Sequence, residues 1–216
     1  MKQLLIATVT ALGLAASSGV GHATLTYTIW NGAGLSTTAT FPVPSSGLFA
    51  TFTDNVDTLN FRDNNPQGGS VTFADFFGAS SAGTHLTPAQ LGTTMSTIGD
   101  DVTTFIQITE TYDLAAPLTS TIDHDDGAAI YLDGAGNGAQ LCGSPSEATE
   151  NTQTCTFPAG PHNLTLLYTE DNGAPSILVV SLPPEVPEPA TLALLGSSLV
   201  GFALIRRRRR GPIQAA

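Results

Sequence analysis

The chain is interrupted by glycine and proline at short intervals, and this spacing constrains its fold more than any other feature. Its 216 residues include Gly 22 and Pro 14, so few uninterrupted stretches are long enough for core helices. The apolar runs between them are short and rich in β-branched and aromatic residues, as strands are. With 41% hydrophobic residues to form a core, the pattern predicts one all-β domain of ordinary size.

Several segments of the first half carry the pattern expected of strands. Residues 24–30 alternate between apolar side chains and threonines, as a half-buried strand does. A short helix is expected at Thr87-Pro88-Ala89, because Thr87 is a good N-cap and proline is tolerated at the first helical position. Further strands are expected at 48–53, 70–77 and 102–112.

The second half predicts two hairpin-like units. Residues 118–122 and 128–132 flank the turn-rich sequence His124-Asp125-Asp126-Gly127, and residues 163–169 and 176–182 flank Glu170-Asp171-Asn172-Gly173. Within the last strand, Ile177-Leu178-Val179-Val180 is apolar on both faces. Such a run favours a strand inside a sandwich of two sheets.

The N-terminus has the organisation of a secretory signal peptide. Lys2 precedes an apolar run from Leu4 to Ala16, and Gly21-His22-Ala23 offers small residues at the spacing that a signal peptidase reads. We therefore expect residues 1–23 to be removed on export. The alternative is a short buried helix at the terminus.

The C-terminus predicts a single membrane span. Pro187-Glu188-Pro189 precedes an apolar run at 190–205, which would rise about 24 Å as a helix. That is slightly less than a bilayer core of ~30 Å, and snorkelling arginines can cover the difference. Residues 183–189 form the linker, and the basic tail 206–216 is expected on the cytoplasmic side. Its basic cluster is Arg206, Arg207, Arg208, Arg209 and Arg210.

Removing both ends leaves a strongly acidic domain. Between Thr24 and Val186 only Arg62 is basic, against 17 carboxylates, so the net charge is −16, compared with −11 for the whole chain. Such a surface repels nucleic acid and anionic lipid and favours cations. We expect no nucleic-acid partner, and divalent metal is the natural ligand for this domain.

Cys142 and Cys155 are the only cysteines. An even pair in an exported chain predicts a disulfide, and no third soft ligand lies nearby to favour a metal site instead.

The C-terminal residues resemble the PEP-CTERM sorting signal of Gram-negative bacteria, in which Pro-Glu-Pro, a membrane span and basic residues follow in this order. The resemblance implies that an exosortase cuts near Pro187-Glu188-Pro189 after transient anchoring in the inner membrane. It also implies a cell-surface or extracellular-matrix location and an association with exopolysaccharide or biofilm. The alternative is a plain anchor that no enzyme cuts, which would have the same span and charges.

Residues 119–134, which contain Asp125-Asp126-Gly127 and end in Asp133-Gly134, are similar to the signature of PA14 domains. Residues 157–170 look like the closing PA14 hairpin. The resemblance covers residues 100–182 well and residues 24–99 only loosely, and it implies a PA14-like antiparallel β-sandwich over residues 24–182.

In one branch of that family, the yeast adhesins, two adjacent aspartates joined by a cis peptide bind calcium, which in turn holds sugar hydroxyls. Asp125 and Asp126 match those positions, while Glu170 stands where the branch has an asparagine ligand. The resemblance thus implies calcium as a cofactor of a lectin-like site. The candidate metal ligands are Asp125, Asp126, Glu170, Asp171 and Asn172.

The alternative is that Asp125-Asp126-Gly127 is a structural turn. No motif for a catalytic nucleophile, a phosphate-binding loop or a metalloprotease is visible in the sequence. We therefore expect a non-enzymatic exported protein, with a calcium-dependent carbohydrate-binding module as the alternative.

Overall fold

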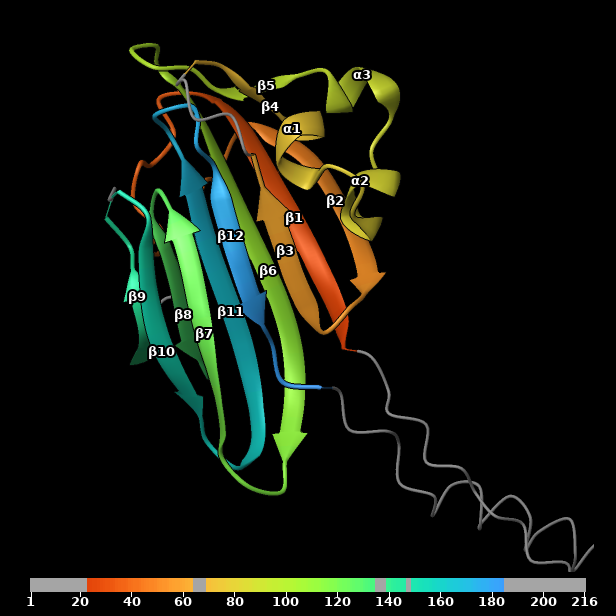
Figure 1. Cartoon of the computed structure of the whole chain (residues 1–216), viewed down its shortest axis with the longest axis vertical. Coiled ribbons are helices and arrows are strands. Elements are labelled where there is room, and N and C mark those ends of the chain that lie inside the picture. The colour runs from red at the N-terminus through yellow and green to blue at the C-terminus, as the bar shows by residue number, and fades with distance from the viewer. Residues whose placement is uncertain (1–22, 64–68, 135–138, 147–148, 185–216) are drawn as a thin grey trace, which may run out of the picture. The chain divides into compact units, whose positions relative to one another are not determined.

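The computed structural model describes residues 23–63, 69–134, 139–146 and 149–184. In these residues most of the regular structure is strand, and two antiparallel sheets face each other (Figure 1). The expected all-β sandwich is therefore confirmed. The expected signal peptide, Pro-Glu-Pro triplet, membrane span and basic tail lie outside the described residues. None of the helices within the described ranges is long and apolar enough to cross a membrane.

The larger sheet has the strand order β2-β1-β6-β11-β8-β9, and the smaller one has the order β10-β7-β12-β3. A short pair, β4-β5, lies beside them. The larger sheet consists of β1 (Thr24–Ala33), β2 (Leu48–Asn55), β6 (Val102–Leu114), β8 (Ala128–Leu132), β9 (Ala139–Ser144) and β11 (Gly160–Glu170). The smaller sheet consists of β3 (Thr58–Arg62), β7 (Leu118–Asp125), β10 (Asn151–Phe157) and β12 (Ile177–Ser181), and the short pair of β4 (Val71–Thr72) and β5 (Thr94–Ser96).

The main core lies between the two sheets. Alternate residues of β1 point into it, with Leu25, Tyr27 and Ile29 fully buried, while the threonines between them face outward. The predicted placement of β12 inside the sandwich is confirmed, because Leu178 and Val180 are buried between the sheets. A second, smaller cluster around Trp30, Phe105, Ala129, Tyr131 and Leu167 is covered by Leu35, Phe41 and Val43.

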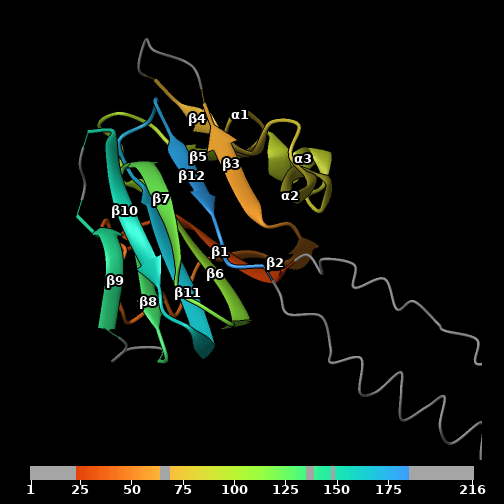
Figure 2. The ribbon, with the colours of Figure 1, turned by 60° about the horizontal axis from the view of Figure 1, so that its bottom comes forward.

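Three short helices occupy the side of the sandwich where β2 and β3 form the sheet edges (Figures 1 and 2). They are α1 (Phe73–Phe77), α2 (Ser81–Thr84) and α3 (Pro88–Leu91). The helix start predicted at Thr87 is confirmed, since its side chain accepts a hydrogen bond from the backbone of Gln90.

The strand predicted at 70–77 is wrong after its first residues. Only Val71–Thr72 is extended, and α1 follows because Thr72 and Asp75 form a capping box. The aromatic side chains of α1, Phe73, Phe76 and Phe77, are buried against the core.

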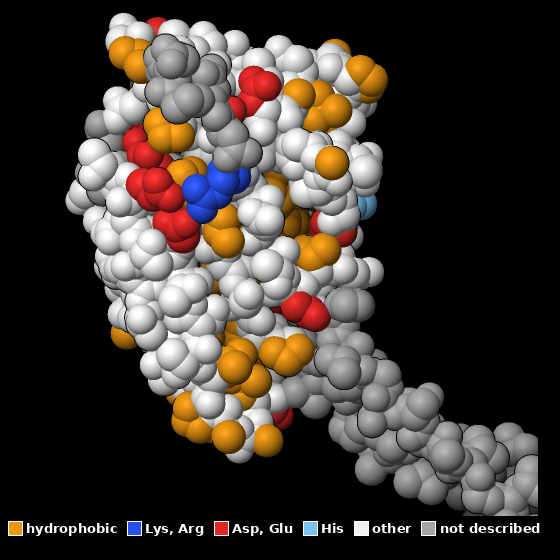
Figure 3. Space-filling view, viewed as in Figure 1, with side chains coloured by type: hydrophobic (Ala, Val, Ile, Leu, Met, Phe, Trp, Pro, Cys, Tyr) orange, Lys and Arg blue, Asp and Glu red, His pale blue; other side chains and the backbone are white. Residues whose placement is uncertain are grey.

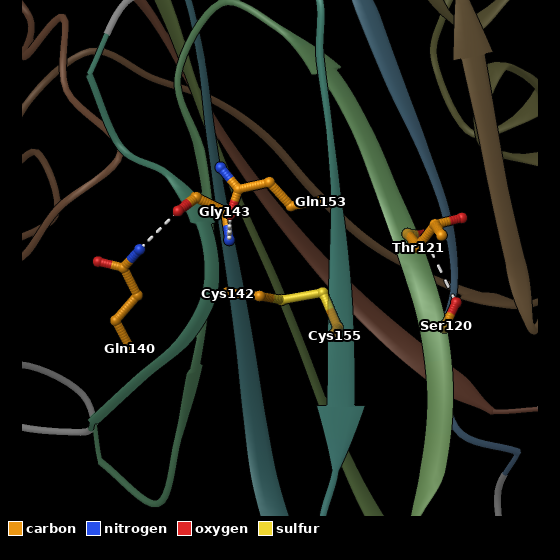
Figure 4. Close-up of a disulfide and its surroundings, with 7 residues drawn as sticks. All are labelled: Ser120, Thr121, Gln140, Cys142, Gly143, Gln153 and Cys155. Atoms are coloured by element: carbon orange, nitrogen blue, oxygen red, sulfur yellow. Dashed lines mark hydrogen bonds between the residues drawn. A yellow bond between two sulfur atoms is a disulfide. The ribbon is translucent and has the colours of Figure 1, made fainter.

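The predicted disulfide is confirmed between Cys142 of β9 and Cys155 of β10 (Figure 4). Its two cysteines belong to different sheets, so the bond joins the sheets along one edge. Cys155 is fully buried, whereas Cys142 keeps 7% of its surface exposed.

The two predicted hairpin-like units are wrong in their pairing. β7 and β8 lie in different sheets, and so do β11 and β12. β7 instead pairs with β10 and β12, and β11 pairs with β6 and β8. The two turn-rich sequences therefore connect the sheets across the top of the sandwich in Figure 1. This correction determines where the candidate site lies.

Candidate functional site

Three connections between the sheets meet at one end of the described part of the sandwich. They join β7 to β8, β9 to β10, and β11 to β12. The strand register places them side by side, because Asp125 of β7 is opposite Ile177 of β12 and Tyr168 of β11 is opposite Ala128 of β8. Polar residues far apart in the sequence are thus brought together.

A shallow pocket of about 410 Å³ lies between these connections. The first connection supplies Asp125 and Asp126, and the second supplies Thr149. Ile98 stands at the pocket with 60% of its surface exposed, although it is a large apolar residue. The remaining lining residues are Asn172, Gly173, Ala174 and Pro175.

Asp126 organises the β11–β12 connection. One of its carboxylate oxygens, Oδ2, accepts hydrogen bonds from the backbone N–H groups of Asp171 (2.7 Å) and Asn172 (3.1 Å). Its other oxygen, Oδ1, accepts a longer bond of 3.4 Å from the Asn172 side-chain amide. Burial raises the pKa of Asp126, and these donors act against that rise. The Asp126 carboxylate therefore anchors this connection.

Asp125 has fewer fixed partners than Asp126. Burial and the neighbouring Asp126 charge raise the pKa of Asp125 to about 6, while the backbone N–H of Glu150 lowers it. Its side chain is the more available of the two aspartates to a ligand in the pocket.

Glu170 is fully buried beneath the pocket and part of a directional chain of hydrogen bonds. The Gly173 N–H donates to Ser96 Oγ at 3.0 Å, and that hydroxyl lies 2.8 Å from Glu170 Oε1. The Tyr168 hydroxyl lies 2.8 Å from Glu170 Oε2 and 2.7 Å from the backbone oxygen of Asp125.

The two contacts of the Tyr168 hydroxyl are best satisfied by a protonated Glu170. A carbonyl oxygen only accepts, so the single Tyr168 hydroxyl proton goes to Asp125. Glu170 Oε2 must then carry a proton and donate it to the tyrosine oxygen. Consistent with this, burial first and the Asp126 charge second hold the pKa of Glu170 well above its usual range. Glu170 is a neutral structural acid in the fold.

Asp171 points to a different groove. Its Oδ1 accepts a hydrogen bond from the Thr103 hydroxyl. Asp171 lines a separate surface groove together with Asp100 and Asp101. It therefore does not share the pocket of Asp125 and Asp126.

Two glycines of this region are required by close packing. A Cβ on Gly127 would lie 2.5 Å from the backbone oxygen of Pro145 and 2.6 Å from Thr169 Oγ1. A Cβ on Gly173, where φ is +78°, would lie 2.1 Å from the backbone oxygen of Gly69. The glycine of Asp125-Asp126-Gly127 thus has a structural purpose, whatever the aspartates bind.

The structure brings together three of the five predicted metal ligands, namely Asp125, Asp126 and Asn172. Glu170 and Asp171 lie elsewhere. Within the described ranges, no cluster of three or more His, Cys, Asp or Glu side chains could hold a metal ion. The Asp125–Asp126 peptide is also not among the cis bonds of these residues, which precede Pro42 and Pro175. That feature of the adhesin resemblance is therefore not reproduced.

Sequence reasoning missed Ile98, Thr149 and Pro175 as pocket residues. Each comes from a connection whose position depends on which strands pair, and no local motif marks it. A further pocket of about 550 Å³ lies between β3 and the helices. Its carboxylate, Asp54, already accepts a hydrogen bond of 2.6 Å from Ser81.

Several solved structures are similar to this chain in part. The PA14 domain of the antifreeze protein MpAFP has 15% identity and a TM-score of 0.44, with 75% of this chain and 85% of that chain covered. The Candida glabrata epithelial adhesin 9 A domain, in complex with Galβ1-3GlcNAc, has 11% identity and a TM-score of 0.46, with 78% and 85% covered. No curated protein matches the sequence.

An α-xylosidase of Xanthomonas citri is similar at 9% identity and a TM-score of 0.39, over 79% of this chain. This chain corresponds to only 16% of the length of that enzyme.

The C-terminal segment has a match of a different kind. The family model of the PEP-CTERM protein-sorting motif matches residues 185–210. The match includes Pro187-Glu188-Pro189, the apolar run and the five arginines, as the sequence predicted. This motif implies processing by an exosortase, and proteins that carry it are exported and sorted to the surface of Gram-negative bacteria. The chain is therefore a β-sandwich protein with a PEP-CTERM sorting motif at its C-terminus.

Proposed function

We propose that this chain is a non-enzymatic component of the cell surface or extracellular matrix, delivered there by its sorting tail and associated with exopolysaccharide. The observation that carries the proposal is the PEP-CTERM motif at residues 185–210, directly after the acidic sandwich domain. The net charge of −16 between Thr24 and Val186 keeps the delivered domain soluble and attracts cations.

The sorting part is tested by changing the triplet while keeping the span and the arginines. Pro187→Ala with Glu188→Gln and Pro189→Ala should leave the chain in the inner membrane with its tail uncut. Pro183→Ala with Pro184→Ala, just outside the triplet, is the matched control and should behave as the wild type. If the triplet variant reaches the matrix as efficiently as this control, the proposal fails.

A second candidate function, calcium-dependent carbohydrate binding, is favoured by the pocket at the sheet connections. Its donor set consists of hard oxygens, two carboxylates and one amide, which suit calcium better than a softer metal. Asp125, Asp126 and Asn172 fit such an ion in type. Calcium takes 6 to 8 oxygen ligands, so backbone carbonyls and water would complete the shell. Bound there, calcium would offer open coordination positions to sugar hydroxyls.

The exposed Ile98 supports a carbohydrate ligand at the same place. Sugars present C–H faces as well as hydroxyls, and a pocket that recognises them combines apolar walls with a few fixed polar groups. Ile98 and Pro175 provide apolar surface beside Asp125. Because Asp126 is committed to the β11–β12 connection, Asp125 is the residue whose loss should affect ligands most directly.

Asp125→Asn tests this second function, with Asp113→Asn as a matched control. Asp113 lies on the exposed side of β6 and outside the pocket lining. Its replacement by asparagine removes one carboxylate, as Asp125→Asn does, without changing the pocket. We expect calcium binding by calorimetry and polysaccharide retention to fall for Asp125→Asn alone. If the two variants bind calcium and retain polysaccharide equally well, the hypothesis of calcium-dependent carbohydrate binding fails. The hypothesis of a matrix component would remain.

A further inference from the structure

Arg62 lies in register with the candidate pocket. It is the only lysine or arginine in the described part of the chain. Arg62 of β3 is opposite Ile177 of β12, which is in turn opposite Asp125 of β7. Two strand spacings, about 10 Å, therefore separate the backbones of Arg62 and Asp125. In Figure 3 the one blue side chain lies next to several red acidic ones.

The guanidinium of Arg62 joins three segments. Its Nη2 lies 2.6 Å from Asp123 Oδ2 on β7, and its Nη1 lies 3.1 Å from Glu150 Oε1 in the β9–β10 connection. The side chain of Arg62 is 34% exposed, and those of Asp123 and Glu150 are 20% and 51% exposed. The contact with Asp123 links β3 to β7 within one sheet, whereas the contact with Glu150 holds the β9–β10 connection against β3.

The fastened connection forms one wall of the pocket. Thr149 lines the pocket next to Asp125 and Asp126. The backbone N–H of Glu150 faces the Asp125 carboxyl closely enough to lower its pKa. Residues 149 and 150 thus lie beside Asp125 in the pocket wall, and the Glu150 side chain joins them to Arg62.

We infer that Arg62 is a positioning residue, which holds residues 149 and 150 against Asp125 so that the pocket wall stays in place for a cation. The part of this inference that concerns calcium affinity rests on the calcium-binding function proposed above. Its structural part, the fastening of the wall, is independent of calcium.

The sign of the effect on calcium affinity separates positioning from simple electrostatics. If Arg62 acted only through its charge, its removal would tighten calcium binding, because one repulsive charge near the pocket would be lost. If Arg62 positions the wall, its removal weakens binding. Removing the Glu150 charge weakens calcium binding under both the positioning hypothesis and the electrostatic one. Only a change at Arg62 distinguishes the two hypotheses.

Four variants of the full-length chain in mild detergent test the inference. Arg62→Met keeps the length of the side chain without its charge, and Arg62→Lys keeps the charge. Glu150→Gln breaks only the contact to the wall. Asp123→Asn is the matched control, because it removes the same charge from the other partner of Arg62 and leaves the wall contact in place.

Two readouts are needed, calcium affinity by calorimetry and amide hydrogen exchange at residues 149 and 150 without calcium. We expect Arg62→Met to weaken calcium binding about three- to fivefold, the range of such ion pairs. Glu150→Gln should weaken it more than Asp123→Asn, and Arg62→Lys should recover part of the affinity. Exchange should accelerate in Arg62→Met and Glu150→Gln but not in Asp123→Asn.

Tighter calcium binding by Arg62→Met, or unchanged exchange at residues 149 and 150, overturns the inference. If the wild type itself gives no heat with calcium, the calcium-binding function fails. The exchange data then decide alone whether Arg62 fastens the wall.

Discussion

Replacing Glu170 by glutamine should stabilise the domain at neutral pH. Glutamine has the shape of a protonated glutamic acid, with an oxygen that accepts from Ser96 and an amide that donates to Tyr168. The hydrogen-bond chain therefore survives in Glu170→Gln. What changes is that the variant no longer releases a proton when it unfolds.

The magnitude follows from proton linkage. The folded state raises the pKa of Glu170 well above its usual value, so between the unfolded and folded pKa the folded state binds one more proton than the unfolded state. The contribution of Glu170 to the wild-type free energy of unfolding is therefore complete below its unfolded pKa of about 4.5. Above that pH the free energy of unfolding falls by ~1.4 kcal/mol for each pH unit, until the folded pKa is reached. Glu170→Gln lacks this loss, so its advantage grows as pH rises.

The assay is denaturant unfolding of residues 21–186, the compact unit, at several pH values from 4 to 7. The two proteins should be about equally stable near pH 4, and the variant should be more stable at pH 7. Glu170→Ala is the contrasting variant, because it leaves the Ser96 and Tyr168 hydroxyls short of a partner, at a cost of about 3 kcal/mol. A pH dependence in Glu170→Gln equal to that of the wild type would refute the assignment of a neutral Glu170.

Three further outcomes are expected. Cys142→Ser with Cys155→Ser should lower the free energy of unfolding by about 3 kcal/mol in chemical denaturation, because the bond spans a sequence separation of 13. Gly127→Ala should cost more than about 2 kcal/mol, because its Cβ would meet Pro145, whereas Gly92→Ala, with its nearest neighbour 3.6 Å away, should change stability by less than about 1 kcal/mol in the same assay. The hydrogen bond to Asp133 raises the pKa of His162 and lowers that of Asp133, so NMR should show His162 titrating above 6.5 and returning toward 6.5 in Asp133→Asn. The His162 contribution to stability is present below pH 6.5 and lost as pH rises through the raised pKa, so a normal His162 titration in the wild type would contradict the contact.

Local patterns predicted much of the fold because they report on burial residue by residue. The alternation of residues 24–30 matches the inward and outward residues of β1, and the apolar run 177–180 matches a strand covered in the sandwich. The disulfide followed from the export signal and an even number of cysteines. Thr87 and Pro88 marked a helix start because capping is a local interaction.

Pairing between strands could not be predicted in the same way. A turn-rich sequence between two strands looks alike whether the strands pair with each other or belong to facing sheets. Where the connection Asp126-Gly127 crosses between the sheets, Gly127 lies against Pro145 and Thr169, which are distant in sequence. The segment 70–77 predicts a strand for a related reason, since the burial of its aromatic residues alone does not distinguish a strand from a capped helix.

The sequence predicts only part of the candidate site, because the rest depends on tertiary contacts. The resemblance to PA14 adhesins predicts Asp125, Asp126 and Asn172 as ligands, and the crossing connections bring all three to one pocket. The side chains of Glu170 and Asp171 point in other directions, one into the core and one into a separate groove. Which way consecutive residues of a loop point depends on tertiary contacts such as those of Ser96 and Thr103.

The most direct test of the account is the intact mass of the mature protein recovered from its producing cells. Sorting through the motif at residues 185–210 predicts a chain that lacks its signal peptide, ends near Pro187-Glu188-Pro189 and has lost the five arginines. A surface-located chain that keeps Arg206 to Arg210, in cells that contain an active exosortase, would contradict it.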